Sequence, residues 1–445
     1  MDASTSPFQF RDYRAFWLAR VVSTIGNTML VVVIGIHVYD IARRTMSIEE
    51  ASFWLGMIGL AQFLPLFLLT LIAGYVADRV DRRWIVRISL ALEMCCAAGL
   101  AALVWLDAMS LIPLFVVAVL LGIGRAFAGP ALGSIAPNLV PPAILPSAIA
   151  LNAIAWQAGS VAGPLLGGAA YAISWSLPYE ASAFLYLLSV AAMMMIRPIP
   201  RGNAAQTHPL RAVVEGLAYV RDNKIVLGAI SLDLFAVLLG GATAMLPVYA
   251  RDILHVGPEG LGAMRAAPAV GAALTALILA RRPLKRHVGV KMFAAVALFG
   301  LATLVFGLSH WMWLSLASLF VIGATDMVSV YVRSSLIQLH TPDAMRGRVS
   351  AVSGLFISAS NELGEFRAGL AGSAIGPIAA VAGGGALAVL VTGLCAWAFP
   401  SIRKADHFVA PDADILAEAC GKDMPDVEAP ALVAGFKPQA ETGAA

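Results

Sequence analysis

The feature that most limits the fold of this chain is a series of apolar segments, each long enough to cross a bilayer and separated by short polar breaks. A helix needs about 20 mostly apolar residues to cross the hydrocarbon core. Hydrophobic residues make up 60% of the chain and charged residues only 13%, unlike the mixture found in soluble domains. The sequence therefore argues against a water-soluble fold and predicts an all-α membrane protein.

The apolar segments fall into two sets of six. The connection between the sets, Arg197 to Lys224, holds several prolines and a glycine, which is typical of a linker. We therefore expect an N-terminal six-helix bundle (1–196), a cytoplasmic linker (197–223), a C-terminal six-helix bundle (224–402) and a disordered cytoplasmic tail (403–445). The twelve segments begin near Arg20, Ser52, Trp84, Leu111, Pro146, Ala181, Ile225, Leu261, Val288, Trp311, Val349 and Pro377.

Basic residues follow alternate connections, and cytoplasmic loops of membrane proteins carry an excess of Lys and Arg. The intervening connections hold only Arg43, Arg44 and Arg251. Met1 to Arg14 has no apolar core, so we expect no cleaved signal. The pattern predicts a multi-pass protein of the bacterial inner membrane with both termini in the cytoplasm. The basic loop residues are Arg79, Arg82, Arg83, Arg87, Arg281, Arg282, Lys285, Arg286, Arg346 and Arg348.

Several classes of function lack the residues that they need. The sequence has no Gly-x-x-x-x-Gly-Lys-Ser/Thr phosphate loop, which disfavours an ATP-driven pump. Its histidines are scattered and its four cysteines match no disulfide or metal-ligand spacing. We therefore expect no enzyme, no cofactor, no metal and no nucleic-acid partner.

The two halves of the chain resemble each other. Gly122 and Pro141 have the spacing of Gly323 and Pro342, with an offset of 201 positions (323 − 122). Transporters built from repeated bundles place their substrate site between the repeats and move one bundle against the other. We therefore expect alternating access. The same offset lays Gly159, Gly163 and Gly168 over Ser360, Gly364 and Gly369.

The stretch from Gly74 to Arg83 (GYVADRVDRR) closely resembles the signature of the major facilitator superfamily in the loop after its second helix. The resemblance implies the major facilitator fold, with 12 transmembrane helices in two six-helix bundles related by pseudo-two-fold symmetry, and a monomer. Gly74 would let two helices approach closely, and Asp78, Arg82 and Arg83 would form a latch at the cytoplasmic gate. The alternative is a simple basic anchor. Leu279 takes the place of Asp78 in the second half.

The fifth apolar segment resembles the antiporter motif of exporters in this superfamily, which points to export. Glycines four apart form a groove for a neighbouring helix, and proline removes one helix hydrogen bond. Such packing can seal a proton leak; the alternative is an ordinary packing face of small residues. The motif residues are Gly159, Gly163, Pro164, Gly167 and Gly168.

Three further runs resemble the branch of enterobactin-exporter-like proteins, beginning at Leu232, Leu246 and Ser360. Members of that branch export siderophores or drugs, so the resemblance implies proton antiport of a small-molecule substrate across the bilayer. It leaves the cargo open. Asn27 stands where relatives often carry an acid. The alternative function is a proton-coupled uptake symporter of the same fold.

Ionisable residues deep in a membrane span are costly, and such residues are usually functional. We expect Asp233 to carry the proton, with Arg125 as its partner, and Asn27, Arg125, Trp156 and Asp233 to contact the cargo. A static ion pair, such as Arg333 with Glu362 or Glu365, is the alternative. The expected proton-coupling residues are Asp233, Asp326, Glu362, Glu365, Arg125 and Arg333, with Arg265 as a further counter-ion; His37 and Asp40 are expected to face water, and Glu93 and Glu180 to be structural.

Overall fold

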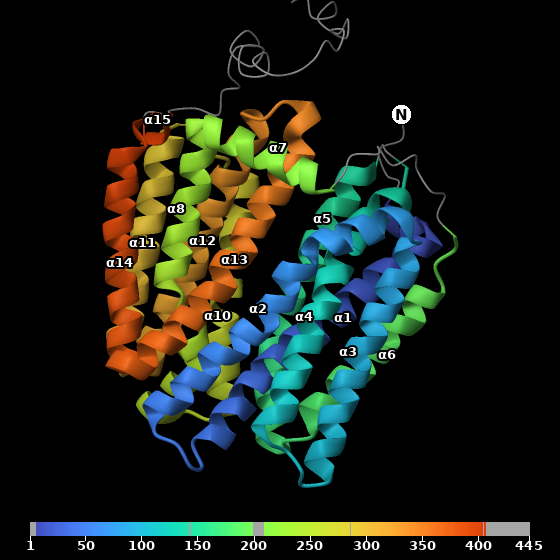
Figure 1. Ribbon diagram of the computed structural model, residues 1–445, viewed down its shortest axis with the longest axis vertical. Coiled ribbons are helices and arrows are strands. Elements are labelled where there is room, and N and C mark those ends of the chain that lie inside the picture. Colours follow the sequence, from blue (N-terminus) through green and yellow to red (C-terminus); the bar gives the residue numbers. More distant parts are fainter. Residues whose placement is uncertain (1–5, 142–143, 199–208, 285, 404, 406–445) are drawn as a thin grey trace, which may run out of the picture. The chain divides into compact units, whose positions relative to one another are not determined.

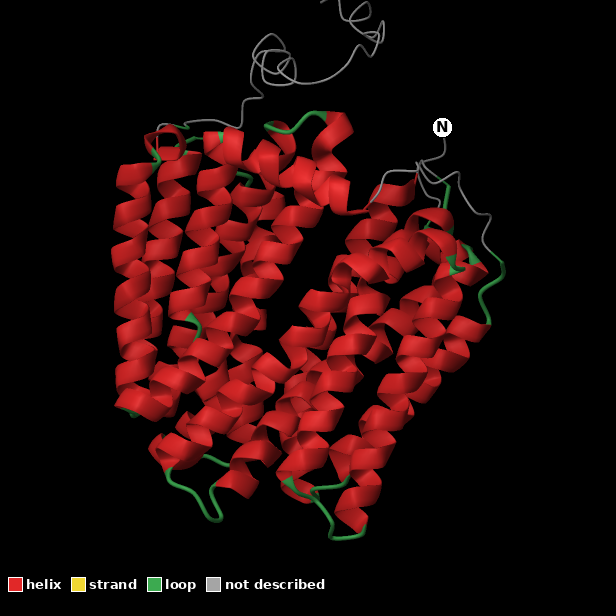
Figure 2. Ribbon diagram, viewed as in Figure 1, coloured by secondary structure: helices red, strands yellow, loops and turns green. Residues whose placement is uncertain are grey.

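The computed structural model describes residues 6–141, 144–198, 209–284, 286–403 and 405, without the side chains of residues 71, 74, 75, 77, 78, 130, 134, 137, 146, 209–212, 343 and 344. Every regular element in this part is a helix (Figure 2). Most of the predicted tail, residues 406–445, lies outside the described part.

Twelve long helices follow one another in two sets of six, which confirms the predicted fold class (Figure 1). Their first residues lie within a few positions of the predicted starts, except that the first helix already begins at Arg11. The first set comprises α1 (Arg11–Ala42), α2 (Ile48–Arg79), α3 (Arg82–Trp105), α4 (Leu111–Ile135), α5 (Leu145–Ile173) and α6 (Leu177–Met194), with short 3-10 turns η1 (Pro7–Gln9) and η2 (Ala136–Asn138).

The second set begins with a helix that is interrupted after Gly240. The 17-residue helix before the break is followed by three short helical elements. These four elements are α8 (Lys224–Gly240), η4 (Thr243–Met245), α9 (Leu246–Val248) and η5 (Tyr249–Ile253). The remaining helices are α10 (Pro258–Arg281), α11 (Val288–Leu308), α12 (Met312–Leu339), α13 (Asp343–Ile375) and α14 (Pro377–Ala398), followed by α15 (Pro400–Arg403).

Eleven of the described helical segments are long and apolar enough to cross a membrane. The twelfth, α13, has 33 residues, which is ample length. It is less apolar because Glu362, Glu365 and Arg367 lie within it. The one span that departs from the usual composition therefore carries much of the charge inside the fold.

Local sequence fixes several helix starts. Ser47 and Glu50 form a reciprocal capping box at the start of α2, with hydrogen bonds of 3.2 and 3.0 Å. The Asp81 carboxylate accepts from the Arg83 amide at the start of α3, and Asn223 does the same for the first turn of α8. These polar side chains satisfy backbone N–H groups at the first turns of the helices and so define where the helices begin.

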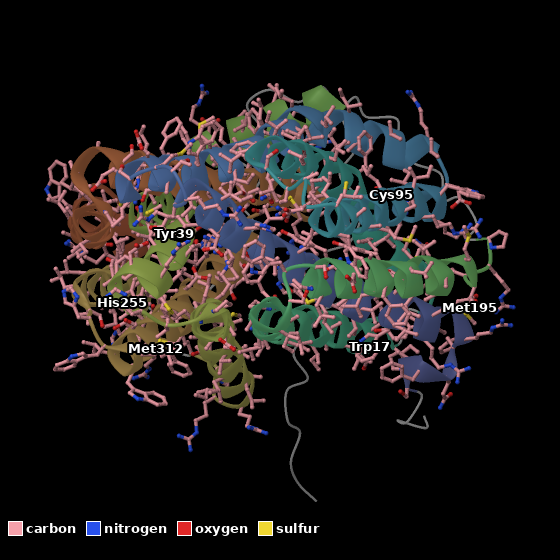
Figure 3. The ribbon with its side chains drawn as sticks, turned by 90° about the horizontal axis from the view of Figure 1, so that it is seen from below. Trp17, Tyr39, Cys95, Met195, His255 and Met312 are labelled. Carbon is pink, nitrogen blue, oxygen red and sulfur yellow. The ribbon has the colours of Figure 1, made fainter. Side chains whose placement is uncertain are left out.

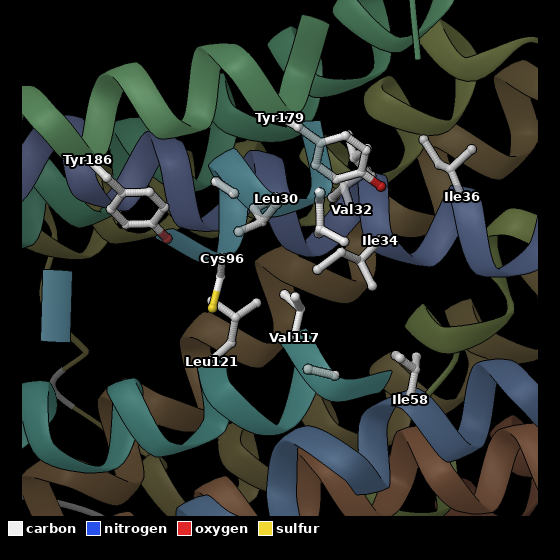
Figure 4. Packing of buried hydrophobic residues seen from close by; sticks show 14 of the residues in the cluster. Leu30, Val32, Ile34, Ile36, Ile58, Cys96, Val117, Leu121, Tyr179 and Tyr186 are labelled. Carbon is white, nitrogen blue, oxygen red and sulfur yellow. The ribbon is translucent and has the colours of Figure 1, made fainter. Parts of the chain in front are cut away.

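The interior of the first bundle is apolar. Side chains of α1 such as Leu30 and Ile34 pack with Val117 and Leu121 of α4 and with Tyr186 of α6 (Figure 4). These side chains are almost completely buried. They form part of an apolar core that continues into buried residues of the second set of helices, such as Met245 and Met264.

Glycine contacts reveal the predicted repeat at the level of single residues. A Cβ at Gly122 of α4 would collide with the Gln62 carbonyl of α2, and one at Gly323 of α12 would collide with the Pro268 carbonyl of α10. Residues 122 and 323 are separated by the predicted offset of 201 positions (323 − 122). The two halves therefore pack equivalent helices through equivalent glycines.

The same symmetry governs the contact between bundles. Gly168 of α5 packs against Gly262 of α10, and Gly369 of α13 packs against Gly56 of α2. These close backbone contacts lie toward the end of the helices at which α2 and α10 begin. We call this the outer end, and the other, at which α7 (Pro209–Asp222) lies, the α7 end.

The predicted linker contains an ordered helix. Within residues 197–223, α7 packs on the second bundle, where the Glu215 carboxylate pairs with Arg348 at 2.7 Å. The Tyr219 hydroxyl donates to the carbonyl of His340. Arg348 lies in α13 and His340 directly follows α12. This helix is therefore attached to the second bundle rather than suspended between the two.

Candidate functional site

An ion pair joins the two bundles near the middle of their helices. Arg125 of α4 approaches Glu362 of α13, with 3.4 Å between Nη1 and Oε1. The Glu362 side chain is only 13% exposed, whereas that of Arg125 is 35% exposed. The pair therefore links a helix of the first set to a helix of the second.

The neighbouring carboxylate, Glu365, is held from its own bundle. The Thr243 hydroxyl donates to Glu365 at 2.9 Å, and Arg265 lies 3.6 Å away. Arg265 also donates to the Thr243 carbonyl, at the first residue of η4. Glu362 and Glu365 therefore lie on one face of α13, as predicted, but each has its own guanidinium.

Glu365 and Arg265 line a cavity between the bundles. Its other walls include Val31 and Gly35 of α1 and Gln62 of α2. About 40 Å³ of this space is open to the centres of water molecules, which is enough for a few waters. We call Arg125, Arg265, Glu362, Glu365 and Thr243 the inter-bundle cluster.

Asp233 and Arg333 form a second pair, inside the C-terminal bundle. Asp233 of α8 contacts the Arg333 guanidinium of α12, and their side chains are 7% and 3% exposed. Asp326 lies two turns earlier on α12 and lines a small cavity with Asp233. Of the described residues, none makes a hydrogen bond or ion pair with Asp326.

The structure corrects the expected pairing. Arg125 binds Glu362 and not Asp233, while Arg333 binds Asp233 and neither glutamate. The reason is geometric: α8 and α12 are neighbours in one bundle, so Asp233 points into that bundle. Asp233 is 6% exposed and does not line the cavity between the bundles. A direct contact with cargo would require the Asp233–Arg333 pair to open.

Two expected cargo-binding residues differ in their surroundings. Trp156 of α5 is 46% exposed, and the Arg20 guanidinium of α1 lies 5.4 Å from its ring centroid. Asn27 of α1 is partly buried, and its Oδ1 finds no hydrogen-bond partner among the described residues. An aromatic face beside a cation and an unsatisfied amide oxygen are both groups that a polar aromatic cargo can use.

The predicted gate latch is only partly described, because only the backbone of Gly74 and Asp78 belongs to the described part of the chain. Arg82 is partly buried. Arg83 binds Asp81 at 2.5 Å and donates to the Ile196 carbonyl at 3.0 Å. The hydrogen bond from Arg83 lowers the pKa of Asp81. Arg83 therefore ties α3 to the end of α6 within its own bundle.

The glycine motif of the fifth span forms the expected groove. A Cβ at Gly159 would meet Thr24, one at Gly163 would meet Thr28, and one at Gly167 would lie 3.0 Å from Met29, all on α1. Gly168 instead faces α10, and the Pro164 carbonyl lies against Gly262 of the same helix. The motif therefore packs α5 against helices of both bundles.

Ion pairs at the outer end were not anticipated from the sequence. Asp40 of α1 binds Arg251 at 2.6 Å, and Arg43 binds Asp252 at 3.1 Å. Tyr39 also donates to Asp252 at 2.5 Å, and the hydrogen bond that Arg43 donates to Asp252 raises the pKa of Arg43. We call these five residues the outer-end cluster; Figure 3 looks at this end and labels Tyr39.

A signal for this cluster is present in the sequence. Asp40 and Arg43 face the oppositely charged Arg251 and Asp252 at corresponding ends of the two halves. The expectation that His37 faces water was wrong: His37 is 1% exposed and its Nδ1 lies 2.9 Å from the Tyr179 hydroxyl. The aromatic residues of α5 and α6 cover it.

Comparison with known proteins identifies the family. The model of the transmembrane secretion effector family matches residues 2–419. The chain belongs to this family of major facilitator transporters. It is therefore a transporter rather than an enzyme.

Its relatives are exporters. The enterobactin exporter EntS of Citrobacter koseri is 24% identical over 344 residues, covering 76% of this chain and 80% of the relative. EntS of Escherichia coli O1:K1 is 24% identical over 377 residues, covering 84% and 88%.

Solved structures share the fold. A POT family transporter in complex with 5-aminolevulinic acid has a TM-score of 0.71 at 12% identity, covering 89% of this chain and 97% of that one. A D-xylose-proton symporter has a TM-score of 0.66 at 16% identity, covering 88% and 98%.

Proposed function

We propose that this transmembrane secretion effector exports siderophore or drug-like molecules from the cytoplasm by proton antiport. The whole-length match to a secretion family carries the proposal for direction, and the relatives named as enterobactin exporters support a siderophore-like cargo. Titratable carboxylates at the contact between the bundles, Glu362 and Glu365, support coupling to protons.

The proposed location is the bacterial inner membrane, with a monomer as the working unit and the α7 end in the cytoplasm. Loop arginines such as Arg79 and Arg346 gather at the α7 end, in agreement with the positive-inside rule. The outer end then faces the periplasm, and both termini are cytoplasmic.

Alternating access would proceed by movement of one bundle against the other. In the present arrangement, the glycine contacts and the outer-end cluster hold the periplasmic side together. Cargo would enter from the cytoplasm toward Trp156 and Asn27. Opening toward the periplasm would require the Asp40–Arg251 and Arg43–Asp252 pairs to separate.

Proton coupling would use the carboxylates at or near this interface. A proton that binds to Glu362 removes its negative charge, so its attraction for Arg125 falls and the bundles lose one of their links. Arg125 is then available to an anionic cargo. Asp233, Asp326, Glu365 and Arg333 would complete the path inside the C-terminal bundle, with the α5 glycine motif limiting proton leak.

The proton gradient is a sufficient energy source. One proton that crosses a potential of 100 mV releases about 2.3 kcal/mol. This free energy supports a concentration ratio of roughly 50-fold per proton, because about 1.4 kcal/mol corresponds to tenfold.

The proposal can be tested in energised inverted vesicles. Enterobactin and a cationic dye are offered separately, and cargo accumulation and lumenal pH are followed with and without a protonophore. We expect accumulation that collapses with the protonophore. Glu362→Gln should abolish cargo-dependent proton release, whereas Glu180→Gln should not, because Glu180 lies at the start of α6 and bonds only Trp105 among the described residues.

The outcomes separate the two directions of transport. Accumulation only in right-side-out vesicles would favour the uptake symporter and overturn export. Accumulation that survives the protonophore would overturn proton antiport while leaving export intact. Equal proton release by Glu362→Gln and wild type would remove Glu362 from the coupling path.

A further inference from the structure

A small cavity inside the C-terminal bundle is lined by residues of α8, α11 and α12. These three helices are neighbours in the bundle (Figure 1). About 10 Å³ of the cavity is open to the centre of a water-sized particle, which is room for one such particle. Phe299 forms part of its apolar wall. Among the described residues, the polar side chains that line it carry only oxygen, and they are Asp233, Thr325, Asp326 and Ser329.

The charges around this cavity do not balance. Asp233 is matched by Arg333, but Asp326 makes no hydrogen bond or ion pair with any described residue. When both carboxylates are ionised, the three groups sum to one negative charge. A charge left uncompensated inside a membrane bundle is costly. The cavity therefore favours one added unit of positive charge.

The unpaired hydroxyl group of Ser329 indicates where in the cavity a positive charge would bind. Ser329 is 3% exposed, and its Oγ has no hydrogen-bond partner among the described residues. Thr325 donates its hydrogen to the Val321 carbonyl at 2.7 Å, so its oxygen lone pairs stay free. Asp326 and Ser329 are three residues apart and share a face of α12. Carboxylate and hydroxyl oxygens together suit a hard cation.

We propose that this cavity binds one dehydrated monovalent cation of the size of Na⁺, held by Asp326, Ser329, Thr325 and the second carboxylate oxygen of Asp233. A divalent ion would leave a net positive charge in the bundle, and a larger ion would exceed the space. The binding itself is independent of the proposed export. The cation site rests on the proposed function in one respect only: the proton of the proposed antiport would compete with the cation for Asp326.

The test measures binding rather than transport. The full chain in detergent is titrated with NaCl, KCl or choline chloride at constant ionic strength and pH 8, and its melting temperature is recorded. We expect a saturable rise on the order of 3 °C with Na⁺, little with K⁺ and none with choline. Lowering the pH should raise the Na⁺ concentration needed, because protons compete for Asp326.

Matched variants locate the site. Ser329→Ala removes one ligand without changing charge and should weaken Na⁺ binding at least tenfold; Asp326→Asn should abolish it. Ser335→Ala is the control, because Ser335 lies on the same helix and, among the described residues, bonds only to the Tyr331 carbonyl of that helix. A wild-type protein that responds to pH but not to Na⁺ overturns the proposal in favour of a proton at Asp326. Unchanged Na⁺ binding in Ser329→Ala overturns the placement.

Discussion

At the scale of single residues, the Asp233–Arg333 pair joins stability to transport. Both side chains are almost fully buried, at 7% and 3% exposure, so each depends on the other for its charge balance. Removing one partner from a buried pair is far more damaging than removing both, since the remaining charge is left without compensation. A variant that lacks both charges should therefore be stable enough for its transport to be measured, and that measurement distinguishes a structural pair from a proton carrier.

We predict that Asp233→Asn lowers the free energy of unfolding by about 3–5 kcal/mol, measured by thermal unfolding in detergent. The double variant Asp233→Leu with Arg333→Met should regain most of that loss, because it removes both charges. If Asp233 carries the proton, the stable double variant still binds cargo but releases no protons. Normal coupled transport by the double variant would show that the pair is structural.

Residues of the site could be predicted in kind but not in pairing. Ionisable residues in apolar spans are visible in the sequence, so Asp233, Glu362 and Arg125 were found. Their partners depend on which face of a helix meets which neighbouring helix. A rotation of one helix about its axis by the angle between successive residues would bring different side chains together. The water-facing prediction for His37 failed for the same reason, because Tyr171 and Tyr179 come from helices distant in sequence.

At the scale of elements, the contact between α1 and α5 depends on glycine. We predict that Gly163→Ala destabilises the protein by about 1–3 kcal/mol, as expected for overpacking. Its Cβ would collide with the Thr28 hydroxyl and lie 2.8 Å from the Ile25 carbonyl. The measurement is thermal unfolding in detergent.

The control for this prediction is Gly129→Ala on α4, where a Cβ meets nothing within 4 Å. It should be neutral or stabilising, since alanine favours helix over glycine. Adding Thr28→Ala to Gly163→Ala should rescue only part of the loss, because the backbone contact at Ile25 remains. Equal stability of the two glycine variants would contradict the proposed packing role.

A second element-scale prediction concerns the attachment of α7. Burial lowers the pKa of His340, which is 7% exposed and lies outside the membrane spans. The unfolded chain therefore takes up a proton near pH 6.5 that the folded protein resists. This contribution to stability is present above about pH 6.5 and is lost as the pH falls toward the lower folded value.

We therefore expect His340→Gln to reduce the loss of melting temperature between pH 7.5 and pH 5.5. Tyr219→Phe is the comparison, because it removes the hydrogen bond from α7 to the His340 carbonyl, together with the bond that the Asn223 amide donates to the same hydroxyl, and leaves the imidazole in place. It should cost about 1 kcal/mol at both pH values. The same pH dependence in wild type and His340→Gln would exclude His340 as the titrating group.

At the scale of the whole molecule, the two-bundle architecture follows largely from the sequence. Span length, loop charge and the repeat offset are local or periodic signals, and Gly122 and Gly323 confirm the offset in three dimensions. The outer-end cluster could not be predicted in the same way. It joins residues about 210 positions apart, such as Asp40 and Arg251, and only the closed arrangement of the bundles brings them together.

Under the proposed alternating access, this cluster would set the balance between the two access states. Partly exposed ion pairs contribute about 0.2–1 kcal/mol each, and the Tyr39 hydrogen bond to the Asp252 carboxylate adds about 1.5–3 kcal/mol. A change of about 1.4 kcal/mol shifts a two-state population tenfold. Loss of the Asp252 carboxylate, which serves both Tyr39 and Arg43, should therefore strongly favour the state that is open at the outer end.

The prediction is read from one reporter cysteine, Val31→Cys, in the cavity between the bundles, after the native cysteines are replaced. Adding Asp252→Asn should speed its labelling by a membrane-impermeant maleimide from the periplasmic side about tenfold. Asp12→Asn is the matched control, because Asp12 pairs with Arg197 at the start of α1, away from the outer-end cluster. High salt should raise the wild-type rate toward that of the variant, since screening weakens partly exposed ion pairs. Equal labelling of the Asp252 and Asp12 variants would mean that the glycine contacts alone hold the outer end closed.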